Sequence, residues 1–145
     1  MCGIVGFISD NKEYDDIKIV NKMLDAIQHR GPDQRGLKKI NNTTIGMVRL
    51  SLISETKHEI PFHDNSGNYF IVYNGELYNH ENLKTNLSSR YEFSTSSDVE
   101  TVMNSYIDNG IKSFYDFNGM YAFAIHDSFK KKTIIVRDKT VEKPL

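Results

Sequence analysis

The segment Met1-Cys2-Gly3-Ile4-Val5-Gly6-Phe7-Ile8-Ser9 places a lone thiol directly behind the initiator methionine. Its run of apolar, partly β-branched residues predicts a buried strand over residues 2–9. Because Cys2 is small, we expect an aminopeptidase to remove Met1, which leaves a thiol and a free α-amine on one residue. An α-amine accepts a proton near neutral pH, so this amine is able to activate its own thiol. The segment therefore predicts a strand that begins at a candidate nucleophile.

The composition is that of one soluble domain. A chain of 145 residues, with 39% hydrophobic and 26% charged residues, is long enough to bury a core. The net charge of −1 gives no electrostatic case for binding nucleic acid or an anionic membrane. No apolar run approaches the roughly 20 residues that span a bilayer, and the start of the chain does not resemble a signal peptide. With a single cysteine, which excludes an internal disulfide, we expect a cytoplasmic protein.

The histidines do not form a recognisable metal-binding pattern. They are scattered, without a His-x-x-x-His pair and without a neighbouring cysteine: His29, His58, His63, His80 and His126. Since zinc sites in proteins are built from clustered His and Cys ligands, we expect no metal site.

Helices and strands are predicted along the whole chain, with no internal repeat and no linker. Apolar residues at helical spacing predict helices over 15–28 and after Asp98, and the stretch 79–88 is helix-like. Runs of β-branched and aromatic residues predict strands over 37–40, 43–50, 69–73, 120–125 and 133–136. The helices do not alternate regularly with the strands, which favours an α+β fold with antiparallel sheets over a parallel doubly wound fold.

Two polar positions allow more than one interpretation. Asn74-Gly75 is a turn signal that is expected to end the strand over 69–73, although a helix follows and the pair need not close a hairpin. Asp98 ends the polar run Ser94-Thr95-Ser96-Ser97-Asp98, where an isolated Asp is most simply a helix cap.

Eight short motifs, taken together, identify a family. They occupy residues 1–6, 29–33, 49–51, 73–79, 97–98, 118–124, 137–138 and 143–145. In this order and spacing they resemble the class II glutamine amidotransferase domain of the asparagine synthetase type, an N-terminal-nucleophile hydrolase. The resemblance implies that residues 1–145 form one glutaminase domain, folded as a four-layer αββα sandwich of two antiparallel sheets.

The resemblance also implies a reaction, the hydrolysis of L-glutamine to glutamate and ammonia. The catalytic residues are then Cys2, Asn74 and Gly75. The Cys2 sulfur attacks the side-chain carboxamide and forms a thioester, while the freed α-amine carries the proton. The Asn74 side-chain amide and the Gly75 N–H stabilise the negatively charged oxygen of the tetrahedral intermediate.

Further residues are implied to bind the amino-acid head group of glutamine. Arg49 clamps the α-carboxylate with its two-pronged guanidinium, and Asp98, with Glu76 nearby, holds the α-ammonium. Arg30 positions the N-terminal residue. In the family, the backbone that follows the arginine lines the pocket, here Leu50, Ser51, Leu52 and Ile53.

Three departures from the family pattern affect these expectations. An acidic residue is usual at the position of Ser54, and Gly-x-Gln-Pro is usual where residues 57–61 read Lys-His-Glu-Ile-Pro. Contacts to glutamine near these positions are therefore expected to differ. Val141 replaces a glycine of the closing motif, and since only glycine readily adopts a positive φ, the connection to any following domain is expected to differ too.

The partners implied by the resemblance are L-glutamine and a synthetase domain or subunit that receives the ammonia. We expect no cofactor in this domain, because ATP and Mg belong to a synthetase domain that is not in this chain. Aspartate is the default acceptor of the ammonia, and a sugar or another acceptor is the alternative. A homodimer is left open.

Two alternatives compete with this glutaminase. One is a glutamine-binding regulatory module without turnover, and the other is an N-terminal-nucleophile hydrolase for another amide. A nucleophile with oxyanion donors favours an enzyme over a binding module. Arg49 and Asp98 match an amino-acid head group, which favours glutamine over other amides.

Overall fold

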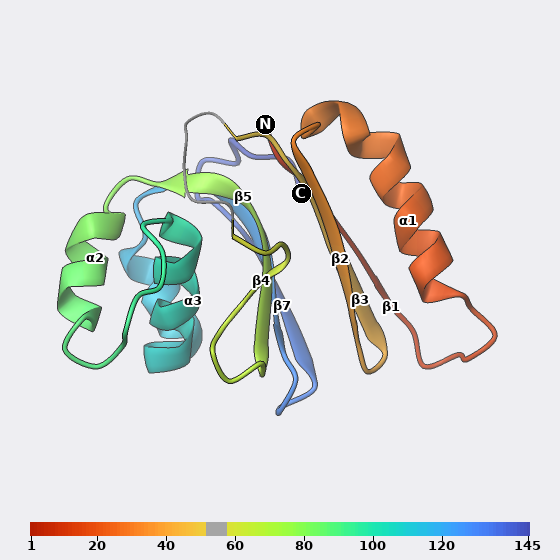
Figure 1. Cartoon of the computed structure of the whole chain (residues 1–145). Helices are drawn as coiled ribbons and strands as arrows, with labels where there is room; N and C mark the ends of the chain where they lie inside the picture. The colour runs from red at the N-terminus through yellow and green to blue at the C-terminus, as the bar shows by residue number, and fades with distance from the viewer. Residues whose placement is uncertain (52–57) are drawn as a thin grey trace.

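Two antiparallel sheets face each other at the centre of the molecule, and helices cover the outer face of each (Figure 1). The computed structural model describes residues 1–51 and 58–145. From one side to the other, the layers are helix α1, the first sheet, the second sheet, and helices α2 and α3. The predicted α+β fold with a four-layer αββα sandwich is confirmed.

The first sheet has the strand order β1-β3-β2, with β1 at Gly3–Ile8, β2 at Gln34–Ile40 and β3 at Thr43–Arg49. Every residue of β3 is buried, because β3 is the central strand and has sheet, helix and second sheet around it. The strand predicted over residues 2–9 is present as β1, but it is not fully buried. It lies at the sheet edge, where Ile8 is 52% exposed.

Helix α1 (Asp16–Ile27) forms where the periodic pattern predicted it. The Asp15 side chain caps its start by accepting a hydrogen bond from the backbone N–H of Lys18 at 3.0 Å. Val20 and Leu24 on its inner face are fully buried against Val48 of the first sheet. The helix thus covers the outer face of that sheet.

The second sheet has the strand order β4-β5-β6-β7, built from Phe62–His63, Tyr69–Leu77, Gly119–Asp127 and Lys132–Arg137. Its outer face is covered by α2 (His80–Leu87), α3 (Asp98–Asn109) and the 3-10 helix η2 (Gly110–Asp116). In the described part of the chain, no helix is long and apolar enough to cross a membrane.

Strand β5 corrects one prediction. It does not end at Asn74-Gly75 but continues to Leu77, and Gly75 pairs with Tyr121 of β6. A Cβ atom at Gly75 would lie 2.6 Å from the carbonyl oxygen of Met120. The glycine therefore allows a close approach of two strands, and the local turn signal is overridden by strand pairing.

The alternation of side chains along β5 divides the core in two. Ile71 and Tyr73 belong to the apolar cluster shared with α3, whereas Phe70 and Val72 belong to the cluster between the sheets, against which Cys2 packs. Because successive side chains of a strand point to opposite faces, Asn74 follows Val72 and lies on the face toward Cys2. The face of β5 that carries Val72 and Asn74 therefore lies toward the thiol, and the face that carries Tyr73 lies toward α3.

The chain after β7 turns back on itself around Asp138. The buried carboxylate of Asp138 accepts backbone hydrogen bonds from Tyr121, Thr140, Glu142 and Lys143 at 2.9–3.2 Å. Val141 adopts a φ of 60°. The valine thus takes the positive φ for which glycine is suited, and the expected difference in the connection to a following domain stays a prediction.

Candidate active site

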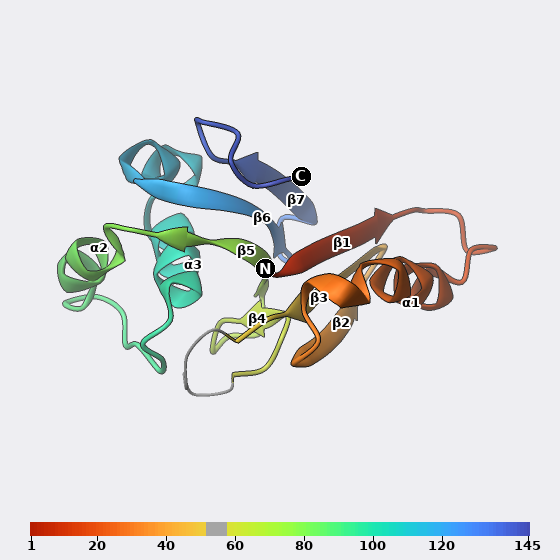
Figure 2. The same cartoon turned by 90° about the horizontal axis from the view of Figure 1, so that it is seen from above.

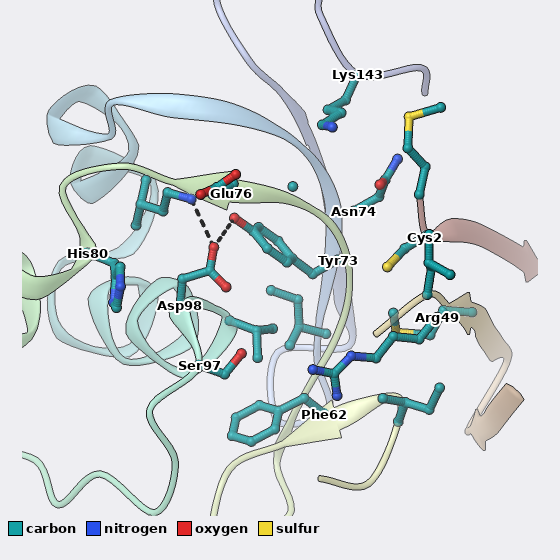
Figure 3. A pocket seen from close by; sticks show the side chains of 18 of the residues that line it. Cys2, Arg49, Phe62, Tyr73, Asn74, Glu76, His80, Ser97, Asp98 and Lys143 are labelled. Atoms are coloured by element: carbon teal, nitrogen blue, oxygen red, sulfur yellow. Dashed lines mark hydrogen bonds between the residues drawn. The ribbon is translucent and has the colours of Figure 1, made fainter. Parts of the chain in front are cut away.

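A cavity of about 440 Å³ opens where the two sheets meet the start of α3 (Figure 3). The structure brings eight of the predicted site residues to its lining: Cys2, Arg49, Leu50, Ser51, Asn74, Gly75, Glu76 and Asp98. Leu52 and Ile53, which were also predicted to line the pocket, lie outside the described residues, as does the departure at Ser54.

Cys2 lies directly before β1, with its sulfur directed into the cavity (Figure 3). Its backbone carbonyl accepts a hydrogen bond from Nε of Arg30 at 3.1 Å. Arg30 comes from the turn after α1 and does not line the cavity itself. Its contact is therefore with the backbone of the candidate nucleophile, and its positioning role stays a prediction. Met1 also lines the cavity.

The loop after α1 packs against the end of β3 and fixes the backbone of Arg49. A Cβ atom at Gly31 would lie 2.5 Å from the backbone nitrogen of Arg49, so only glycine fits there. The Asp33 N–H donates to the Arg49 carbonyl at 3.1 Å, and the Asp33 carboxylate accepts from the Ser51 N–H at 2.7 Å. Residues 31–33 and 49–51 thus form one interlocked unit.

The guanidinium of Arg49 reaches into the cavity from the end of β3 (Figure 3). Its Nη1 lies 3.3 Å from Oε1 of Gln34 and 3.1 Å from Nε2 of His58. Nδ1 of His58 lies 3.1 Å from the Glu59 carbonyl, which can only accept a hydrogen bond. With Nδ1 as the donor to this carbonyl, Nε2 is the acceptor for the arginine, and His58 links Arg49 to the backbone.

The carboxylate of Asp98 is tied to β5. Its Oδ2 accepts hydrogen bonds from the Tyr73 hydroxyl at 2.7 Å and from the Leu77 N–H at 2.8 Å (Figure 3). Asp98 is the first residue of α3, where a negative charge is favoured by the helix dipole. The residue before it, Ser97, occupies the cap position. The interpretation of Asp98 as a simple helix cap is therefore wrong.

Tyr73 is a site residue that the sequence reasoning missed. Burial raises the pKa of its phenol well above the ordinary value, and the neighbouring negative charge of Asp98 raises it further. The hydroxyl thus remains protonated and able to donate at neutral pH. In the sequence, only its position directly before Asn74 pointed to a role in the site. Its contact with Asp98 was not predictable, because the two residues are 25 positions apart.

Other lining residues were not predicted either, among them His58, Phe62 and Lys143. Lys143 lies in the segment that follows β7. Its backbone N–H donates a hydrogen bond to the carboxylate of Asp138, around which this segment turns back. Nothing local in the sequence places these residues beside Cys2. They could be found only once the packing of the layers was known.

The arrangement suits a zwitterionic molecule with a reactive carbonyl group. The cavity combines a thiol with the amide of Asn74, and it adds the cation of Arg49 and the anion of Asp98 (Figure 3). A thiol beside hydrogen-bond donors can add to a carbonyl carbon. Among the described residues, no group of three or more His, Cys, Asp or Glu side chains is placed to hold a metal ion.

Comparison with known proteins agrees with this chemistry. The family model described as "Glutamine amidotransferase domain" matches residues 1–145. Asparagine synthetase B (glutamine-hydrolyzing) of Escherichia coli (strain K12) is 34% identical over 141 residues, which cover 95% of this chain and 25% of that protein. Putative asparagine synthetase (glutamine-hydrolyzing) 2 of Methanocaldococcus jannaschii is 37% identical over 163 residues, covering 99% of this chain and 31% of that protein.

A solved structure shares the fold. Glutamine phosphoribosylpyrophosphate (PRPP) amidotransferase from B. subtilis, complexed with ADP and GMP, superposes with a TM-score of 0.73 at 22% identity. The match covers 97% of this chain and 37% of that chain. The chain spans only 25% and 31% of the length of the two synthetases.

Proposed function

Because the chain belongs to the glutamine amidotransferase domain family, we propose that it hydrolyses L-glutamine to glutamate and ammonia through a thioester on Cys2. The observation that carries the proposal is the shared cavity of Cys2, Asn74, Arg49 and Asp98. The names of two relatives, both glutamine-hydrolyzing synthetases, support glutamine as the substrate.

Glutamine binds through both charges of its head group in this proposal. Arg49 pairs with the α-carboxylate through its fork of N–H donors, and Asp98 accepts from the α-ammonium. Glu76 adds a second negative charge at the exposed side of the cavity. The backbone of Leu50 and Ser51 lines the same cavity beside Arg49.

The chemistry then proceeds at the side-chain carboxamide. The α-amine of Cys2 takes the thiol proton, and the sulfur forms a bond to the carboxamide carbon. The oxygen becomes negatively charged and accepts hydrogen bonds from the Asn74 amide and the Gly75 N–H. The C–N bond breaks as the amine returns the proton to the departing ammonia. Water then adds to the thioester, and glutamate leaves with the thiol restored.

Removal of Met1 is required for this mechanism. While Met1 is present, the nitrogen of Cys2 belongs to a peptide bond and cannot act as a base. Met1 also lines the cavity, so it occupies part of the space beside the thiol. We therefore propose that the processed chain is the active form and that the chain retaining Met1 is inactive.

The ammonia is proposed to pass to a synthetase domain or subunit. Two relatives are named asparagine synthetases, which supports aspartate as the default acceptor. Thioester formation and hydrolysis use only side-chain and backbone groups of this chain and water. We therefore propose that the glutaminase reaction itself needs no cofactor.

The test is glutamate release from L-glutamine by protein whose loss of Met1 is verified by mass spectrometry. Cys2→Ala protein is the matched control and is expected to bind glutamine without turnover. Glutamine binding by processed wild-type protein without glutamate release would support a binding module and overturn the enzyme. Turnover of other amides but not of glutamine would support a hydrolase of another specificity.

A further inference from the structure

We propose that Tyr73 is a positioning residue that fixes the carboxylate of Asp98 and thereby sets the preference of the cavity for amides that carry an α-ammonium group. This inference rests on the proposed function, since it assigns Asp98 to the ammonium of the substrate. It adds a specificity-determining residue that acts through the carboxylate of Asp98.

Two hydrogen-bond donors of β5 bind the same carboxylate oxygen of Asp98. The Tyr73 hydroxyl and the Leu77 N–H both donate to Oδ2 of Asp98, at 2.7 and 2.8 Å. Both donors belong to β5, whereas Asp98 begins α3, so the two bonds join a helix start to the sheet. Hydrogen bonds to an ionised acceptor are short and about twice as strong as neutral ones. The carboxylate is therefore held in one orientation relative to β5.

Packing alone does not account for the hydroxyl of Tyr73. The ring is buried in the cluster with α3 and lies 6.2 Å from the ring of Phe123, a role that phenylalanine would fill equally well. A buried hydroxyl lowers stability unless it is hydrogen-bonded, and its partner here is Asp98. The raised pKa of the phenol, caused by burial and by the Asp98 charge, keeps the proton on this donor.

A fixed carboxylate affects only substrates with an ammonium group. Binding contacts lose strength when the group that makes them is free to sample other geometries. The Glu76 side chain is exposed and makes no hydrogen bond within the described residues, so Asp98 is the better fixed of the two carboxylates. Loss of the Tyr73 hydroxyl is therefore expected to weaken recognition of the ammonium and to leave the carboxamide chemistry unchanged.

The experiment compares L-glutamine with glutaramate, which is glutamine without its α-ammonium group. For Tyr73→Phe, we expect the KM for glutamine to rise about tenfold, because that factor corresponds to the free energy of one hydrogen bond to a charged group. The kcat should change less than about twofold. The KM for glutaramate should stay within about twofold, so the preference for glutamine falls about tenfold. Tyr106→Phe is the control, because Tyr106 is a buried tyrosine of α3 that does not line the cavity.

Equal loss with both substrates, or no change in the preference, would overturn the proposal. Dissociation constants of both compounds in a Cys2→Ala background test it without turnover. In an Asp98→Ala background, Tyr73→Phe should have no further effect on the preference, since the two residues act through one contact. If wild-type protein binds glutamine but releases no glutamate, the proposed function fails while the binding test of Tyr73 stands. If it does not bind glutamine, both fail.

Discussion

Asn74 lies on β5 with only 3% of its surface exposed, so its amide is held in place before any substrate arrives. A fixed donor stabilises the developing negative charge of a tetrahedral intermediate more than it stabilises the bound substrate. For Asn74→Ala, we expect kcat for glutamate release to fall by about 10²–10³ with little change in KM. A large rise in KM at unchanged kcat would contradict this and would make Asn74 a substrate-binding residue.

Gly75 illustrates how one missing side chain shapes the site. In Gly75→Ala the new Cβ would lie 2.6 Å from the carbonyl oxygen of Met120, which is backbone and cannot move aside cheaply. We expect the free energy of unfolding in urea to fall by about 1–3 kcal/mol, as for overpacking of a core. Gly6→Ala is the control, since the nearest atoms to its new Cβ lie at 3.7 Å. Equal stability of the two variants would refute the argument.

At the scale of elements, the turn around Asp138 gives a prediction on pH. Burial alone would raise the pKa of this carboxyl, but the backbone N–H groups of Glu142 and Lys143, the Thr140 hydroxyl and the Tyr121 N–H lower it to about 2. The unfolded value is about 3.9, so the unfolded chain binds the proton more tightly. The carboxylate therefore stabilises the fold above about pH 4, and this contribution is lost as the pH falls toward 2.

Asp138→Asn should be less stable than wild type at pH 6, and the difference should shrink between about pH 4 and 2. The measurement is urea unfolding of both proteins across this range. Asp108→Asn is a suitable control, because Asp108 pairs with Arg90 at an exposed site and exposed pairs contribute little. A stability difference that is the same at pH 6 and pH 2.5 would exclude the proposed role of the carboxylate.

Elements with a strong local pattern were predictable from the sequence, and those that depend on distant pairing were not. The spacing of apolar residues predicted α1 and α3 at the places where the structure has them. The end of β5 was predicted wrongly, because its pairing with β6 is set by residues more than 40 positions away. For the same reason, the sequence pointed to Asp98 but not to the tyrosine that holds it.

At the scale of the whole molecule, the candidate site takes its residues from three layers. Cys2 and Arg49 come from the first sheet, Asn74 from the second, and Asp98 from α3. No single layer carries a complete binding site for an amino acid. Figure 2 shows the start of β1 lying beside β5 near the N-terminus. A ligand bound to all these residues would therefore link both sheets.

Glutamine is accordingly expected to stabilise both sheets together. Added to Cys2→Ala protein, which cannot turn it over, glutamine at about 100 times its dissociation constant should raise the free energy of unfolding by about 2.7 kcal/mol. Hydrogen–deuterium exchange should slow at the end of β3, around Arg49, as well as in β5. In Arg49→Ala the protection of β3 should disappear even at glutamine concentrations that restore binding. Protection confined to β5 in Cys2→Ala protein would mean that the first sheet does not hold the substrate, and the assignment of Arg49 to the carboxylate would fail.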